Sequence, residues 1–300
     1  MSATGSAGTA YEALVEDHGQ DARWAFGSGF SGGAAEIGAP VPDGVDAADL
    51  AAYCLMLGDD ALICSHRLSE WVGNAPELEE EVALANIALD LLGQARVLLA
   101  RAGHVEGAGR DKDALAYWRT DREFRHVGIA ELSDGLDFAH AIARLLAFSS
   151  WRLALLERLR GSRDPVLAAV AGKGVPELTY HRDYAARWAL RLGDGTDESH
   201  RRLQAACETV WPHVEELYRA CDVERRLVAA GVAVDPGEVR AEVDPVLNEV
   251  LARATLTRPQ CPPVGALAGR SGRDGVHTEQ LGPLLAQKQS LARQHPGATW

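Results

Sequence analysis

One segment, residues 77–102, constrains the fold more than any other part of the chain, because it reads as a single long helix without a breaker. Its acidic N-terminal end and arginine-bearing C-terminal end suit the helix dipole. Residues 82–99 are almost wholly apolar, and Asn86, Asp90 and Gln94 interrupt them at every fourth position, on one face. A polar stripe on so apolar a helix is predicted to point into the core of a bundle, where carboxylate-bridged metal sites are built.

The composition excludes several classes of protein. The 300 residues are 47% apolar, which is ample for a sizeable core, and a net charge of −13 argues against binding to nucleic acid or to an anionic membrane. No apolar run of membrane-spanning length and no basic-then-apolar N-terminus occurs, so we expect neither a membrane span nor a signal peptide. The five scattered cysteines, without a C-x-x-C pair, predict reduced thiols and a cytoplasmic protein.

Residues 1–48 differ in composition from the rest of the chain. They are rich in Gly, Ala and Ser, and their acidic residues outnumber a single basic residue, Arg23. This composition predicts a flexible acidic extension. The alternative is that the aromatic cluster at residues 23–26 docks onto a surface.

From residue 49 onward the hydrophobic pattern has a helical period almost throughout, and strand signals are nearly absent. We predict helices at residues 49–73, 77–102, 135–160, 165–193, 199–220, 222–231, 236–254 and 278–294.

The breaks between these helices predict their arrangement. Residues 74–76 separate the first pair, and residues 161–165 separate the second, with Asp164 as N-cap and Pro165 at the first helical position. Two such hairpins joined by a longer crossover, at about residues 103–134, are typical of an all-α, ferritin-like helical bundle, here with additional C-terminal helices in one domain at 49–300. Three prolines should kink or divide later helices: Pro176, Pro212 and Pro245.

A di-iron centre in such a bundle needs two Glu-x-x-His motifs and further carboxylates on facing helices. The one Glu-x-x-His motif joins Glu123 to His126 in the charged crossover, and we interpret it as a salt-bridged surface turn and not as a ligand pair. Between Asp137 and Glu157 the third helix has no carboxylate at all.

The remaining ligand positions are degraded. Leu91 and Gln94 stand where the second helix would carry Glu and His, and Leu178 precedes His181 on the fourth helix. Glu70 is the one well-placed acid on the first helix. Since leucine cannot bind a metal and a glutamine carbonyl is a feeble iron ligand, we interpret these five positions as a vestigial site that binds no metal, with no catalytic residue. The simplest interpretation of His181 is a buried, hydrogen-bonded histidine.

Several stretches resemble the C subunit of the phenylacetyl-CoA epoxidase complex, over about residues 50–300. They lie at residues 57–62, 67–71, 75–79, 83–96, 162–165, 180–181, 191–197, 232–236, 277–283 and 296–300.

The resemblance implies a bacterial multicomponent oxygenase of aerobic phenylacetate degradation, which converts phenylacetyl-CoA to its ring 1,2-epoxide. It implies a ferritin-like di-iron A subunit that does the chemistry, and a C subunit that pairs with it as a structural partner. A B subunit and a reductase with flavin and an iron–sulfur centre, which uses NADPH, complete the system. It further implies that this chain binds no cofactor.

In di-iron bundles the residue before a Glu-x-x-His motif is often an Asp that bonds the histidine of the other motif. Asp90 holds that position before Leu91. We therefore expect Asp90 to hydrogen-bond to His181, with Gln94 in the same network and Glu70 as a further candidate.

Two other functions remain open from the sequence. One is an independent di-iron oxidase, and the other is a helical bundle that binds an acyl-CoA, with Arg182 and Arg187 as candidate phosphate contacts that are more simply surface charges. The oxidase would use the following residues: Glu70, Glu123, His126 and His181.

Overall fold

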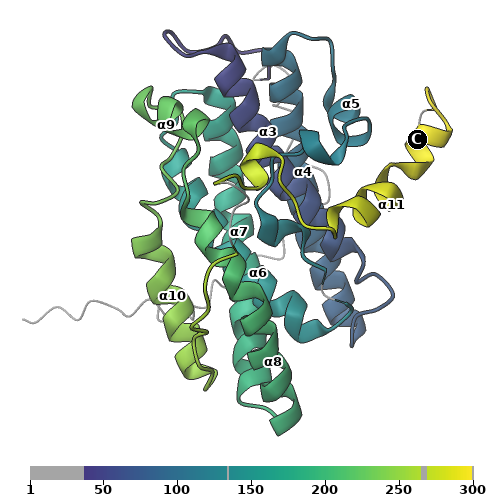
Figure 1. Ribbon diagram of the computed structural model, residues 1–300, viewed down its shortest axis with the longest axis vertical. Coiled ribbons are helices and arrows are strands. Elements are labelled where there is room, and N and C mark those ends of the chain that lie inside the picture. The colour runs from purple at the N-terminus through teal and green to yellow at the C-terminus, as the bar shows by residue number, and fades with distance from the viewer. Residues whose placement is uncertain (1–36, 134, 265–268, 299–300) are drawn as a thin grey trace, which may run out of the picture.

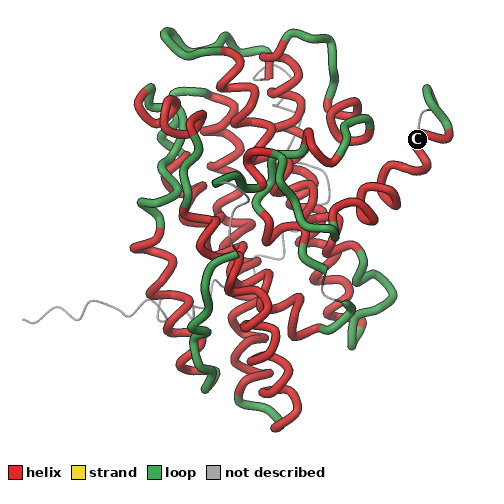
Figure 2. The backbone as a smooth tube through the Cα atoms, in the orientation of Figure 1, coloured by secondary structure: helices red, strands yellow, loops and turns green. Residues whose placement is uncertain are grey.

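The computed structural model describes residues 37–133, 135–264 and 269–298, and these ranges contain helices and loops without a β-strand (Figure 2). The α-helices are α3 (Ala47–Ser69), α4 (Leu78–Glu106), α5 (Lys112–Tyr117), α6 (Phe138–Leu159), α7 (Pro165–Gly193), α8 (Asp197–Val210), α9 (Asp222–Ala229), α10 (Arg240–Arg253) and α11 (Leu281–Gln294). Four 3₁₀ helices lie between them: η1 (Asp121–Glu123), η2 (Gly128–Glu131), η3 (Trp211–Tyr218) and η4 (Gly272–Asp274).

The core is a bundle of two helical hairpins. Helix α3 packs along α4, α6 packs along α7, and α4 contacts α7, which joins the two hairpins (Figure 1). Helices α8 and α10 add to the α6–α7 side, and α11 contacts α5 of the crossover. The predicted ferritin-like bundle with additional C-terminal helices is therefore confirmed.

The start of α7 is built as the sequence predicts. The Oδ1 of Asp164 accepts hydrogen bonds from the backbone N–H groups of Val166 at 3.1 Å and Leu167 at 3.0 Å, and Pro165 is the first helical residue. The other oxygen of this buried carboxylate accepts from Arg101 of α4 at 2.6 Å. One side chain thus both caps α7 and ties it to α4.

The prolines behave differently from one another. The predicted helix at 199–220 is divided, because α8 ends at Val210 and a 3₁₀ segment that contains Pro212 follows. Pro176 and Pro245 lie inside α7 and α10, and both helices run on past them, so of the two predicted effects, a kink or a division, these prolines do not cause the division.

Residues 37–46 pack onto the bundle before α3 begins. Arg101 donates to the carbonyl of Ile37 at 2.9 Å, and Arg163 donates to the carbonyl of Asp43 at 3.1 Å. Val41 and Val45 pack against the core. The aromatic cluster at residues 23–26 lies outside the described residues.

Helix α4 is long and apolar enough to cross a bilayer by length and composition alone, contrary to the expectation from the sequence. Its most apolar window is 44% buried within the protein, where α4 packs on α3 and α7. Core helices of bundles pass the same test, so this is weak support for a membrane span.

Candidate functional site

The predicted contact between Asp90 of α4 and His181 of α7 is present. The Nε2 of His181 lies 3.0 Å from the Oδ2 of Asp90, and the imidazole is fully buried. Burial lowers the pKa of His181, and the hydrogen bond with Asp90 opposes that effect. A neutral ring that donates from Nε2 to the carboxylate fits this environment, and it leaves Nδ1 without a partner among the described residues.

Gln94 lies one turn further along α4 and bridges two other helices. Its Nε2 donates to the Oε2 of Glu177 on α7 at 2.9 Å, and its Oε1 accepts from the Nε of Arg152 on α6 at 3.1 Å. Burial raises the pKa of Glu177 to about 7. Gln94 is therefore a member of the core network, as expected, but its partners are two residues to which the sequence pattern assigned no role.

Arg152 brings a positive charge into the centre of the bundle. Its fully buried guanidinium donates to the carbonyl of Leu57 at 3.2 Å and lies 3.9 Å from a carboxylate oxygen of Asp60. Burial lowers the pKa of Arg152. Asp60 itself is held by Arg273, with two contacts of 2.9 and 3.0 Å. The sequence offered one signal for this residue, because Arg144 and Arg152 lie eight residues apart on one face of the largely apolar α6.

The residues at the predicted ligand positions do not fit a di-iron centre. Leu91 and Leu178 are fully buried and offer no donor atom. The nearby polar atoms are an amide, one imidazole bound to Asp90, the Glu177 carboxylate and the Arg152 guanidinium. Two metal ions need several carboxylates to balance their charge, and a fixed guanidinium repels them.

Glu70 lies outside this network, so its candidacy as a member is wrong. It follows the last residue of α3, where its carboxylate accepts from Arg67 at 2.8 Å. Arg67 also donates to the carbonyls of Glu131 and Gln280. Glu70 thus holds Arg67 at the end of α3, and Arg67 in turn binds the C-terminal segment, residues 269–298.

The two residues of the Glu-x-x-His motif diverge. Glu123 is exposed and accepts from the backbone N–H of Thr120 at 2.8 Å, which closes the surface turn η1 as expected. His126 is fully buried, and the interpretation of it as part of a surface turn is wrong. Its partner is Glu131, at 2.6 Å from Nε2.

His126 belongs to a second buried cluster, with Glu131 and His277. The rings of His126 and His277 stack at 4.2 Å with 17° between their planes. Both nitrogens of His277 face acceptor oxygens, at 3.0 Å for the Phe124 carbonyl and 3.1 Å for Glu131. Burial is the largest single effect and opposes charge on His277, but the hydrogen bond and the charge of Glu131, together with the Phe124 carbonyl, outweigh it and raise the pKa of His277.

This His126–Glu131–His277 cluster has the residue types of a metal site, and its ligand atoms lie within 4.8 Å of one another. A metal ion binds an imidazole nitrogen close to the plane of the ring, and two stacked, nearly parallel rings cannot both satisfy that condition. The geometry suits a hydrogen-bonded ion pair that fastens the C-terminal segment. The cluster could not be foreseen from the sequence, because Glu131 and His277 are far apart in the chain.

Outside the core, α4 presents an apolar face that no described element covers. Four large apolar side chains of this helix are exposed, namely Leu78, Val82, Leu89 and Leu92. Their spacing places them along one side of the helix. An exposed row of this length is typical of a surface that meets a partner.

Comparison with known proteins identifies the relatives of this chain. A family model described as "Phenylacetic acid catabolic protein" matches residues 41–300. The chain is 44% identical over 252 residues to the C subunit of 1,2-phenylacetyl-CoA epoxidase from Escherichia coli (strain K12). The matched region covers 84% of this chain and 99% of that relative.

Proposed function

The chain belongs to the phenylacetic acid catabolic protein family, and from that premise we propose that it is the non-catalytic structural subunit of a phenylacetyl-CoA 1,2-epoxidase complex in the cytoplasm. In this proposal it pairs with a ferritin-like A subunit, which carries the di-iron centre, and stabilises it. A B subunit and a reductase with flavin, an iron–sulfur centre and NADPH complete the complex, and this chain binds no cofactor.

The observation that carries the non-catalytic role is the Arg152–Gln94–Glu177 network between leucines at ligand positions. A bundle that activates dioxygen holds metal ions at this place, whereas here a guanidinium supplies the positive charge. Beside this network, the Nε2 of His181 and the carboxylate of Asp90 bind each other. The core can therefore support a stable fold without offering a site for oxygen chemistry.

An independent di-iron oxidase fits the geometry poorly, because its four candidate ligands have separate partners. Glu70 pairs with Arg67, Glu123 closes an exposed turn, and His126 pairs with Glu131. His181 is bound to Asp90.

The apolar face of α4 supports the pairing with another subunit. A permanent heteromeric interface is commonly large and hydrophobic. Leu89 and Leu92 lie on the same helix as the core network but point out of the bundle. A partner that covers this face would bury side chains that the described part of the chain leaves in water.

Iron analysis tests the non-catalytic role. The protein expressed in iron-supplied medium is expected to carry far less than one iron per chain, whereas the co-purified complex with the A subunit carries iron. About two irons per isolated chain would contradict the proposal.

Co-expression with the A subunit tests the partner surface. Leu89→Glu, on the exposed face of α4, is expected to reduce co-purification of the A subunit and the activity of the mixture. Leu291→Glu is the matched control, since Leu89 is 48% exposed and Leu291 of α11 is 52% exposed. Equal effects of both substitutions, or none from Leu89→Glu, would place the interface elsewhere.

A further inference from the structure

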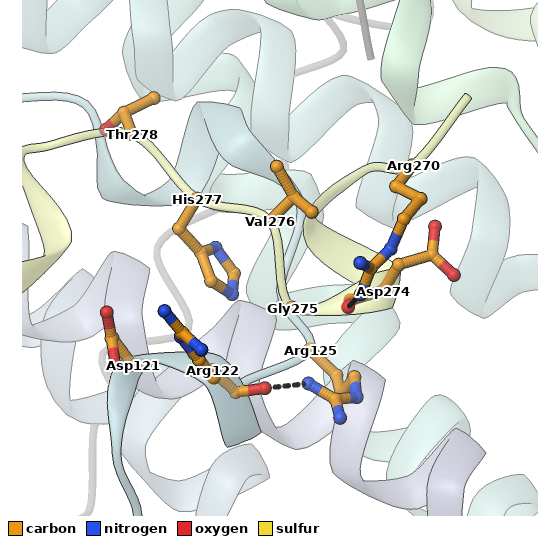
Figure 3. A pocket seen from close by; sticks show the side chains of 9 residues that line it. All are labelled: Asp121, Arg122, Arg125, Arg270, Asp274, Gly275, Val276, His277 and Thr278. Atoms are coloured by element: carbon orange, nitrogen blue, oxygen red, sulfur yellow. Dashed lines mark hydrogen bonds between the residues drawn. The ribbon is translucent and has the colours of Figure 1, made fainter. Parts of the chain in front are cut away.

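Three arginines converge on one cavity between the crossover and the C-terminal segment. Arg122, Arg125 and Arg270 line a space of about 530 Å³, together with His277 (Figure 3). The chain as a whole has a net charge of −13, so a gathering of positive side chains at one place runs against its overall charge. The same cavity is lined by two acids, Asp121 and Asp274.

Backbone carbonyls, and not carboxylates, hold two of these arginines in position. Arg125 donates from Nη1 to the carbonyls of Arg122 at 2.6 Å and Phe124 at 2.8 Å, the first of which Figure 3 draws. Arg270 donates to the carbonyl of Asp274 at 2.9 Å. A carbonyl fixes a guanidinium without neutralising its charge, so most of the N–H groups of these two arginines stay available.

The acids of the cavity do not cancel this charge. Within the described chain, no side-chain carboxylate forms an ion pair with Arg122, Arg125 or Arg270. The Asp274 carboxylate accepts from the backbone N–H of Ser271 at 3.0 Å, where it closes the turn η4. His277 adds no surplus charge, because one of its nitrogens lies 3.1 Å from the Glu131 carboxylate and the other faces the Phe124 carbonyl.

The charges of the lining therefore leave a surplus. With His277 balanced by Glu131, three guanidinium groups face two carboxylates, a difference of one positive charge. Planar guanidinium forks match the oxygens of a phosphate and bind them through paired, charge-assisted hydrogen bonds. Three guanidinium groups without a carboxylate partner and a positive surplus suit the oxygens of a phosphate group.

We propose that this cavity binds the phosphate group of a phosphorylated small molecule. Its volume falls within the range of about 300–1,000 Å³ that small-molecule sites occupy, which exceeds the need of a free phosphate ion. Among the described residues, no Phe, Tyr or Trp side chain lines the cavity, so no aromatic ring is present to stack on a nucleotide base. The cavity therefore recognises the phosphate group of the ligand. The cavity is separate from the Asp90–His181 network and adds a binding activity to the structural role.

Calorimetric titration of the full chain at low ionic strength tests the proposal. Inorganic phosphate, pyrophosphate and coenzyme A are the probes, sulfate is the comparison anion, and sodium chloride at matched ionic strength is the blank. Saturable binding of one phosphorylated ligand per chain is expected. Arg122→Gln and Arg270→Gln should each weaken it at least about tenfold, as expected for loss of a charged hydrogen-bond donor.

Arg201→Gln is the matched control, because it removes one positive charge from an exposed residue of α8 that pairs with Glu198 at 2.8 Å. It should change the affinity less than about twofold, through the general electrostatic field alone. Arg122→Lys keeps the charge but removes the planar fork, so an intermediate loss is expected. Since Arg122 and Arg270 are exposed, the variants should fold, which circular dichroism checks.

The probes also separate the sources of the phosphate. Tighter binding of coenzyme A than of pyrophosphate assigns the cavity to a thioester cofactor, and the reverse order assigns it to a smaller phosphorylated metabolite. Three results would overturn the proposal: no saturable binding, equal binding of sulfate and phosphate, or unchanged affinity in both arginine variants. Loss of A-subunit binding in those variants without any effect on phosphate would instead show a protein contact.

Discussion

The Nε of Arg152 donates a hydrogen bond to the Oε1 of Gln94 at 3.1 Å, and this contact joins α6 to α4 inside the bundle. Gln94 stands at a position where we expect a di-iron bundle to carry histidine, so the contact brings a covalently attached cation beside a predicted ligand position. Unlike a metal ion, this charge cannot be lost or exchanged. The bundle thus holds a buried positive charge between α4 and α6.

Replacing Arg152 and replacing Arg273 should change the stability of the chain by different amounts. Arg273 makes two contacts with Asp60, so Arg273→Met leaves that buried carboxylate short of a partner and should lower the free energy of unfolding by about 3–5 kcal/mol. Arg152 lies 3.9 Å from Asp60, and its Nη1 has no hydrogen-bond partner within the described chain. Arg152→Met should therefore change stability by no more than about 1–2 kcal/mol, in either direction.

Urea denaturation of the two variants measures this difference. Equal losses of stability would contradict this difference between the two arginines. A larger loss for Arg152→Met would show that Arg152, and not Arg273, is the main partner of Asp60.

Asp90→Ala should cost stability more than chemistry. The variant leaves the buried N–H of His181 without an acceptor, which should lower the free energy of unfolding by about 1–3 kcal/mol. Asp90→Asn keeps an acceptor oxygen and should cost less. Denaturation of the isolated chain, together with the turnover of the assembled complex per di-iron centre, separates the two effects. A large loss of turnover in a fully assembled Asp90→Ala complex would mean that this chain takes part in the reaction.

Much of this arrangement could be predicted from the spacing of residues within single helices. The stripe of Asn86, Asp90 and Gln94 indicated the inward face of α4, and the position of Asp90 before Leu91 indicated His181 as its partner. The first inference needs only the helical period, and the second needs in addition the pattern of di-iron bundles, in which an Asp before the motif bonds the opposite histidine.

The partners of Gln94 could not be predicted in the same way. Arg152 is 58 residues from Gln94 in sequence, and Glu177 is 83 residues away. Which long side chain reaches across a bundle depends on the rotation of each helix and on the rotamers that packing allows, and the period of one helix gives neither. The surface position predicted for His126 was wrong for a related reason, since its charged neighbours in sequence are not its neighbours in space.

Glu177 should make stability fall as the pH rises. Its pKa is about 7 in the folded chain and about 4.3 in an unfolded one, so between these values the folded state holds the extra proton. Stability then decreases with rising pH across this window and levels off above it. Glu177→Gln keeps the hydrogen bond to Gln94 and removes this dependence on pH. The free energy of unfolding of the variant, relative to that of the wild type, should therefore be higher at pH 8 than at pH 5 by on the order of 2 kcal/mol.

Unfolding of the wild type and of Glu177→Gln at both pH values gives the difference directly, and effects common to both proteins cancel. A difference that does not change between pH 5 and pH 8 would mean that Glu177 is ionised throughout.

His277 should also make stability fall as the pH rises, but at higher pH than Glu177. Its pKa is raised by hydrogen-bond partners, whereas that of Glu177 is raised by burial. Its pKa is raised in the folded chain, because Glu131 and the Phe124 carbonyl accept from a ring that carries both protons. The contribution is therefore complete below the unfolded value of about 6.5 and is lost as the pH rises through the folded pKa. His277→Gln should cost about 1.5–3 kcal/mol at pH 6, the range for a hydrogen bond to a charged group, and clearly less at pH 9.

His104→Gln is the control for this measurement, since His104 is exposed near the end of α4. It should leave stability almost unchanged at both pH values. Limited proteolysis gives an independent readout, because the Glu131 carboxylate also accepts from the backbone N–H of Thr278 at 2.5 Å and so holds the segment that leads into α11. Cleavage of the chain near Thr278 should be faster in His277→Gln than in the wild type at pH 6. At pH 9 the two rates of cleavage should differ little. A loss of stability that is the same at both pH values would show that His277 acts through packing against His126 and not through its charge.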